Sequence, residues 1–189
     1  MVGWNIAALV GVPGVGKTSL CRSAAGALGY RHVNYGELML DVAMSLDLAS
    51  NQDEMFELDI EVQQSIWKAA AIKVREMKGI YSKILLDLHG VDNSDIGYLI
   101  SLPIEIVSPD IIVVVESSYD NILMRRHSDK LRIRTIEGIK SVEEHMELLR
   151  MSMVACSIVS DSFLTVLNND NFEISLDELK DVLSGGTDC

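Results

Sequence analysis

Residues 11–18 read Gly-Val-Pro-Gly-Val-Gly-Lys-Thr and match the pattern G-x-x-x-x-G-K-[ST]. In such a loop the backbone N–H groups surround the β-phosphate of a nucleotide, the lysine reaches the β- and γ-phosphates, and the hydroxyl holds Mg²⁺. The pattern therefore predicts an ATP-binding loop in which the lysine also stabilises the transferred phosphoryl group. The predicted ATP-binding residues are Gly11, Val12, Pro13, Gly14, Val15, Gly16, Lys17, Thr18 and Ser19.

The segments on either side of this loop are the ones that phosphate binding needs. Residues 5–10 form a short apolar run, which is typical of a buried parallel strand, and residues 18–29 have the apolar face and closing glycine of a helix. A helix that begins at the loop points its dipole and its free N–H groups at the anion. A glycine-rich turn without a ligand is the alternative, but a chance match would rarely stand between a strand and a helix.

Asp87 ends another apolar strand, predicted at residues 83–88. An acidic residue at the carboxyl edge of a strand near such a loop orients Mg²⁺ or its waters. We therefore predict Thr18 and Asp87 as the metal residues, with Mg²⁺ as the cofactor; a carboxylate that only caps a loop is the alternative. His89 comes directly after this predicted strand and is a candidate for acceptor contact, although a lone histidine is more often structural.

Basic residues gather in one segment of an otherwise acidic chain, whose net charge is −12. Five of its 16 Lys and Arg residues fall between positions 125 and 134: Arg125, Arg126, Lys130, Arg132 and Arg134. Arginine suits phosphoryl transfer because its planar fork binds phosphate oxygens through two N–H groups. We expect Arg125, Arg132 and Arg134 to be catalytic and Arg126 to bind ATP. The alternative for Arg125 and Arg126 is stabilisation of a helix C-terminus.

Composition sets the remaining bounds. A length of 189 residues predicts one domain, and the acidic charge argues against nucleic acid as a partner. No apolar run approaches the ~20 residues that span a bilayer, and the N-terminus lacks the features of a signal peptide. Cys21, Cys156 and Cys189 show neither paired spacing nor a metal pattern, so we expect a reducing, cytoplasmic environment.

Strand-like and helix-like segments alternate along the chain, which predicts an α/β fold with a doubly wound, parallel, five-stranded sheet flanked by helices. We expect a turn at residues 51–58, an irregular segment at 89–101, and capping boxes that begin at Ser141 and Ser175. The predicted strands are residues 5–10, 30–34, 83–88, 110–116 and 163–167. The predicted helices are residues 18–29, 37–48, 60–77, 119–126, 141–160 and 175–183.

Taken together, these residues resemble the archaeal-type adenylate kinases, a branch of the nucleoside monophosphate kinases in the P-loop NTPase superfamily. The similarity runs nearly from end to end. Its most specific parts are Gly-Tyr-Leu at residues 97–99 and the order Met-Arg-Arg at 124–126 followed by Arg-x-Arg at 132–134. Further matches are residues 11–18, Val-Asn-Tyr-Gly at 33–36, Asp-Glu-Met at 53–55, and Asp87 with His89.

The resemblance implies a P-loop kinase fold in a single domain over residues 1–189. It further implies a short lid at about 127–138, an acceptor-binding flap at about 34–62, and the reaction ATP + AMP ⇌ 2 ADP with Mg²⁺. Relatives in this branch tend to form trimers, so a homo-oligomer is expected. The acceptor-binding residues that it implies are Asn34, Tyr35, Gly36, Asp53, His89, Gly97 and Tyr98.

The chain departs from this family where a phosphate of the acceptor would bind. Relatives usually carry arginines before and after the position of Met55, where this chain has Gln52, Phe56 and Glu57. Two alternatives therefore stay open: a P-loop kinase for a different small acceptor, or an ATP-binding regulatory or assembly protein with slow ATPase activity. Adenine is usually read partly by backbone groups, and residues 168–171 are a candidate for that edge.

Overall fold

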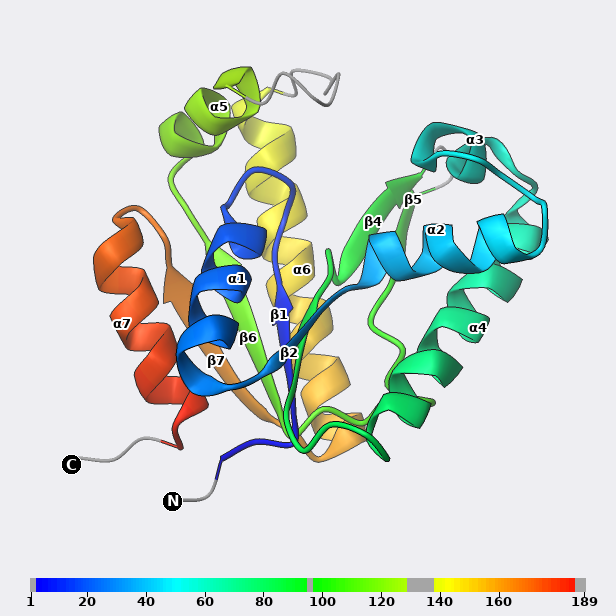
Figure 1. The fold of residues 1–189 in the computed structure, drawn as a ribbon. Coiled ribbons are helices and arrows are strands. Elements are labelled where there is room, and N and C mark those ends of the chain that lie inside the picture. The colour runs from blue at the N-terminus through cyan, green and yellow to red at the C-terminus, as the bar shows by residue number, and fades with distance from the viewer. Residues whose placement is uncertain (1–2, 95–96, 129–137, 186–189) are drawn as a thin grey trace.

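Five parallel strands form the central sheet of the computed structural model, which describes residues 3–94, 97–128 and 138–185 (Figure 1). The strands lie in the order β2-β3-β1-β6-β7, and each neighbouring pair runs parallel. The predicted α/β class and five-stranded parallel sheet are thus confirmed. The strands are β1 (Ile6–Val10), β2 (Arg31–Asn34), β3 (Ile84–Asp87), β6 (Ile111–Glu116) and β7 (Phe163–Asn168).

Helices cover both faces of this sheet (Figure 1). α1 (Lys17–Leu28) packs against α7 (Phe172–Leu183) on one face, and α6 (Ile139–Ser160) packs against β6 on the other. α2 (Tyr35–Ser45), α3 (Gln52–Glu57) and α4 (Ile60–Met77) stand together at the side, with α2 packed on α4. Because apolar side chains are covered on both faces, the central strands read as nearly continuous apolar runs.

The order of the strands fixes where a ligand would bind. The chain leaves β1 toward β2 at one edge, returns to β3, and then crosses to β6 on the other side of β1. In open α/β sheets, ligands bind at the carboxyl ends of the strands where the order reverses in this way. The loop at residues 11–16, between β1 and α1, lies at that end of the sheet. The register places Asp87 of β3 beside Leu9 of β1 and Asn34 of β2.

Two segments predicted to lack regular structure are in fact ordered elements. The predicted turn at 51–58 contains α3, which begins after Asn51, whose side chain accepts a hydrogen bond from the N–H of Glu54. One turn of helix is too short to show a periodic pattern. The predicted irregular segment at 89–101 contains an antiparallel hairpin, β4 (Val91–Ser94) and β5 (Gly97–Ile100). Its first strand is mostly polar, so it lacks the apolar pattern from which a strand is predicted.

The two predicted capping boxes were wrong. α6 begins at Ile139, so Ser141 lies inside its first turn and does not cap it. α7 begins at Phe172 because the side chain of Asn171 accepts hydrogen bonds from the N–H groups of positions 173 and 174. The hydroxyl of Ser175 instead donates to the carbonyl groups of Asn168 and Asn171. α5 (Tyr119–Ser128) follows β6 nearly as predicted, and no helix among the described residues is long and apolar enough to cross a membrane.

Candidate functional site

The loop between β1 and α1 has the backbone shape of a phosphate-binding loop. Gly14 and Gly16 have φ angles of 99° and 91°, in the left-handed region that residues with a side chain rarely adopt. A Cβ atom on Gly16 would also lie 2.5 Å from Nδ2 of Asn169. Gly16 is the N-cap of α1 and makes no side-chain cap, so the dipole and the first N–H groups of the helix face the loop. The glycines of the motif therefore adopt the backbone conformation that a phosphate-binding loop requires.

Three side chains donate hydrogen bonds to carbonyl oxygens of this loop. Arg125 of α5 donates to the carbonyl oxygen of Val15 over 3.1 Å, and Arg126 donates to that of Pro13 over 3.0 Å. Asn169, at the end of β7, donates to the same Val15 oxygen over 2.7 Å. Because these bonds satisfy carbonyl groups, they fix the loop without using the N–H groups that would bind a phosphate.

Lys17 lies under the loop. Its side chain is 6% exposed, and its Nζ donates to the carbonyl oxygen of Gly11 over 2.5 Å and to that of Val12 over 3.4 Å. Charged lysines are seldom so buried unless partners satisfy them. A bound nucleotide would offer phosphate oxygens in place of these carbonyl groups. Thr18 is partly buried and Ser19 is exposed at the start of α1.

Asp87 lies beside Thr18, at the carboxyl end of β3. The carboxyl group is 3% exposed, its Oδ2 accepts from Nδ2 of Asn34 over 3.4 Å, and it lies 3.6 Å from Nε2 of His32. Burial alone would raise the pKa of this carboxyl, but the neighbouring His32, Lys17 and Thr18 lower it below its usual value. An ionised carboxylate and a hydroxyl are the oxygen donors that Mg²⁺ prefers, so these two residues fit that ion.

The loop after β7 also belongs to this site, and the sequence did not predict the contact that it makes there. Asn169 was considered as a reader of adenine, yet its side chain binds the phosphate loop. Its neighbour Asp170 accepts hydrogen bonds from the N–H of Ser118, the hydroxyl of Ser117 and the amide of Asn121. These bonds join the loops that follow β6 and β7. A contact between residues so far apart leaves no local pattern in the sequence.

The predicted acceptor residues of α2 lie at its first turn. The side chain of Asn34 accepts from the N–H of Glu37 and so caps the helix. Tyr35 is buried in the core, where its hydroxyl donates to the carbonyl oxygen of Trp67 over 2.6 Å, and burial raises its pKa. Gly36 faces α3, because a Cβ atom there would lie 3.6 Å from Nε2 of Gln52. Of these three residues, Tyr35 has its side chain committed to packing.

The other predicted acceptor residues divide into two groups. Asp53 lies on α3 and is exposed. His89, Gly97 and Tyr98 belong to the hairpin region, where Nδ1 of His89 lies 2.8 Å from Oδ1 of Asp92. The ring of Tyr98 packs against that of His145 of α6, at 5.4 Å between centroids. The structure therefore places the hairpin beside α6, whereas Asp53 lies apart from it on α3.

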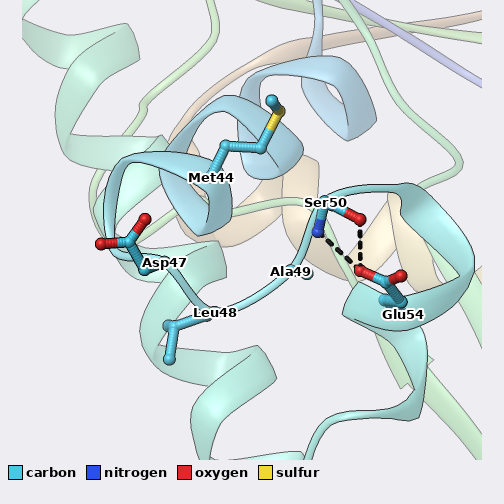
Figure 2. Close-up of a pocket in the computed structure, with 6 residues that line it drawn as sticks. All are labelled: Met44, Asp47, Leu48, Ala49, Ser50 and Glu54. Carbon is cyan, nitrogen blue, oxygen red and sulfur yellow. Dashed lines mark hydrogen bonds between the residues drawn. The ribbon is translucent and has the colours of Figure 1, made fainter.

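An open pocket of about 400 Å³ lies between the end of α2 and α3 (Figure 2). It contains two carboxyl groups and no cationic side chain among its lining residues. One of them, Glu54, accepts hydrogen bonds from the N–H and the hydroxyl of Ser50, which lower its pKa. An acidic pocket repels a phosphate. The lining residues are Met44, Asp47, Leu48, Ala49, Ser50 and Glu54.

The predicted lid falls largely outside the part of the chain that the structure describes. Residues 129–137 are not among the described residues, so Arg132 and Arg134 are not placed. Of the four arginines predicted as site residues between positions 125 and 134, Arg125 and Arg126 are placed, and both contact the phosphate loop.

Comparisons with known proteins agree with this geometry. Residues 10–143 match a family model described as AAA domain. In fold, the chain is similar to the crystal structure of a shikimate kinase from Bacteroides thetaiotaomicron, with a TM-score of 0.51 and 14% identity over 96% of this chain and 99% of that one. At such low identity this likeness concerns the fold alone.

Relatives in sequence are closer. The chain is 47% identical over 174 residues to an "adenylate kinase homolog" of Methanothermobacter thermautotrophicus, a match that covers 91% of this chain and 89% of the relative. It is 37% identical over 185 residues to an adenylate kinase of Methanoculleus marisnigri, with 93% and 96% covered. A Methanococcus vannielii adenylate kinase is 34% identical over 189 residues, with 95% and 98% covered. Together with the fold and the loop geometry, these matches show that the chain belongs to the adenylate kinase family.

Proposed function

We propose that this protein is a nucleoside monophosphate kinase that transfers the γ-phosphoryl group of Mg·ATP reversibly to AMP, giving two ADP. The observation that carries the proposal is the loop at residues 11–16, held on its carbonyl side by Arg125, Arg126 and Asn169 and followed directly by Lys17. Membership of the adenylate kinase family supports the same reaction.

In this proposal the donor side works by position and charge. The N–H groups of the loop and of the first turn of α1 would bind the phosphates, and Lys17 would leave the carbonyl oxygens of Gly11 and Val12 for the β- and γ-phosphates. Arg125 is anchored within reach of the loop through Val15. Arg132 and Arg134, on the proposed lid at about 127–138, would add positive charge and exclude water.

Thr18 and Asp87 would hold Mg²⁺ or its waters. When bound, the ion neutralises charge on the β- and γ-phosphates. Asp87 can take this role because its neighbours lower its pKa, so it stays ionised at neutral pH. On the acceptor side no general base is needed, since a phosphate oxygen of a monophosphate is already ionised.

The acceptor would lie between α2, α3 and the hairpin, near Asn34, Gly36 and His89. The proposed flap at about 34–62 contains no Lys or Arg, and none occurs between Arg31 and Lys68 or between Lys83 and Arg125. In our proposal, the phosphate of AMP is therefore met by Lys17 and the arginines that follow β6. The same lack of cations favours a second candidate, a P-loop kinase whose acceptor has less negative charge than AMP.

The deciding experiment measures coupled ADP formation from Mg·ATP with and without AMP. We expect AMP-dependent turnover that Lys17→Ala abolishes, whereas Lys68→Ala, which removes an exposed lysine of α4, leaves it unchanged. Turnover with another small acceptor but not AMP would favour the second candidate. Slow ATP hydrolysis that no acceptor stimulates would favour an ATP-binding regulatory protein and overturn the kinase proposal.

The remaining expectations are part of the same proposal. We propose a cytoplasmic protein, consistent with the free thiols of Cys21 and Cys156, and a homo-oligomer, as the resemblance to trimeric relatives implies. Partners other than the two nucleotides are not needed for this chemistry.

A further inference from the structure

Three side chains with metal-binding atoms meet beneath the phosphate loop. They are Cys21 from α1, His32 from β2 and Asp87 from β3, and one ligand atom of each lies within 4.8 Å of the others. The three residues come from three different elements. Their spacing in sequence therefore shows no metal motif.

The separation of these atoms suits a small tetrahedral ion. Nε2 of His32 and Oδ2 of Asp87 are 3.6 Å apart. Two such atoms bound at about 2.0–2.1 Å to a tetrahedral Zn²⁺ lie about 3.3–3.4 Å apart, and a sulfur at about 2.3 Å lies about 3.5–3.6 Å from either. The pair of His32 and Asp87 is thus nearly at ligand distance already, and Cys21 has to approach by little more than about an ångström.

Burial and missing partners single out this cluster. Cys21 is fully buried and Asp87 is 3% exposed, while the His32 side chain is 18% exposed and offers a route from solvent. The Nε2 atom of His32 is buried, and its 3.6 Å separation from Oδ2 of Asp87 is too long for a hydrogen bond, so it makes none with the described residues. A buried nitrogen without a partner is costly unless it gains one. A cation between the three residues would supply that partner.

We propose that Cys21, His32 and Asp87 form a binding site for a thiophilic divalent cation of the Zn²⁺ or Co²⁺ class. One thiolate, one imidazole and one carboxylate are the mixed ligands that such ions accept, whereas Mg²⁺ keeps to oxygen. The fourth position is left for water. Because a cysteine binds such an ion as the thiolate, binding releases one proton from the sulfur of Cys21 to solvent.

This site is distinct from the proposed Mg²⁺ position in its ligands but shares Asp87 with it. A thiophilic ion would therefore compete with Mg·ATP for that carboxylate. The existence of the site does not depend on the proposed kinase function, because binding is measured without nucleotide.

The test uses Co²⁺ as an optical probe on the nucleotide-free full chain. The double variant Cys156→Ala/Cys189→Ala keeps Cys21 as its single thiol. We expect it to bind one equivalent of Co²⁺ with a thiolate-to-cobalt charge-transfer band, and to lose that band when Zn²⁺ is added. Removing a residue that only hydrogen-bonds to a metal ligand lowers metal affinity about 10–100-fold. His32→Ala removes a ligand itself, so it should weaken Co²⁺ binding more than about 100-fold.

One further variant, Cys21→Ala, tests the sulfur ligand directly. Cys21→Ala should abolish the band, with near-ultraviolet circular dichroism used to check that the variant folds. If it does not fold, His32→Ala decides alone, because that side chain is at the edge of the cluster. Co²⁺ binding without a thiolate band in the single-thiol protein, or a band unchanged by His32→Ala, would overturn the proposal.

Discussion

Asn169 donates a hydrogen bond from Nδ2 to the carbonyl oxygen of Val15 over 2.7 Å, across 154 positions of the sequence. Arg125 completes a triangle with these two residues, since its guanidinium donates both to the Val15 oxygen and to the carbonyl oxygen of Asn169. The shape of the phosphate loop is therefore set jointly by the loop's own glycines and by the end of the last strand.

Removing the Asn169 side chain should loosen the loop. Asn169 is 1% exposed, and Asn169→Ala leaves the Val15 oxygen with one donor fewer. We expect a loss of about 1–3 kcal/mol in the free energy of unfolding, and ATP binding weakened about tenfold. Denaturant unfolding and nucleotide titration measure the two effects. Asn168→Ala is the control, because that exposed side chain accepts its hydrogen bond from the N–H of Asp170 and not from the phosphate loop; equal effects in both variants would contradict the role assigned to Asn169.

Two glycines of the same region should respond in opposite directions to alanine. Gly16→Ala places a Cβ at a φ of 91° and 2.5 Å from Nδ2 of Asn169, so we expect ATP binding to be lost. Gly26 lies within α1, and a methyl group added there would meet no atom within 4 Å. Gly26→Ala should raise the free energy of unfolding by about 0.4–1 kcal/mol and leave ATP binding intact. Calorimetric ATP titration and denaturant unfolding of both variants give the comparison.

Arg125→Lys tests whether the forked guanidinium, and not its charge alone, holds the loop. Arg125 donates to Val15, Ser117 and Asn169 from two nitrogens of one guanidinium, which a lysine ammonium cannot reproduce. We expect KM for ATP to rise about tenfold or more. Arg22→Lys, on the exposed face of α1, serves as the control. An unchanged KM in Arg125→Lys would show that charge suffices.

The sequence could predict the parts of this molecule that local patterns determine. Central strands, long helices, the phosphate loop and Asp87 all follow from apolar runs, glycine spacing and one carboxylate at a strand end. The contacts of Asn169 with Val15 and of His32 with Asp87 could not be predicted, because these partners are distant in sequence and meet only when the sheet forms. The β4–β5 hairpin escaped detection because Asp92 and Asn93 broke the strand pattern.

Asp170 should make stability depend on pH at the acid end. Hydrogen bonds from the N–H of Ser118 and from Asn121 and Ser117 lower its pKa in the folded protein. A lowered pKa contributes stability that is present above the ordinary aspartate value of about 3.9 and is lost as the pH falls through the folded-state value. Asp170→Asn should therefore lower the free energy of unfolding at pH 7, with a difference that shrinks in strong acid. The exposed Asp177→Asn should not show this pattern.

Adding a cation to the flap should improve an acceptor that carries a phosphate. Phe56 is 55% exposed on α3, so Phe56→Arg can be made without disturbing the core. One new charge-assisted hydrogen bond contributes about 1.5–3 kcal/mol, so KM for AMP should fall about tenfold or more at saturating ATP. Phe56→Leu, which removes the ring without adding charge, should leave KM unchanged. A KM for AMP that Phe56→Arg does not lower would show that an arginine on α3 does not reach the acceptor phosphate, which Lys17 and the arginines after β6 would then bind without help from α3.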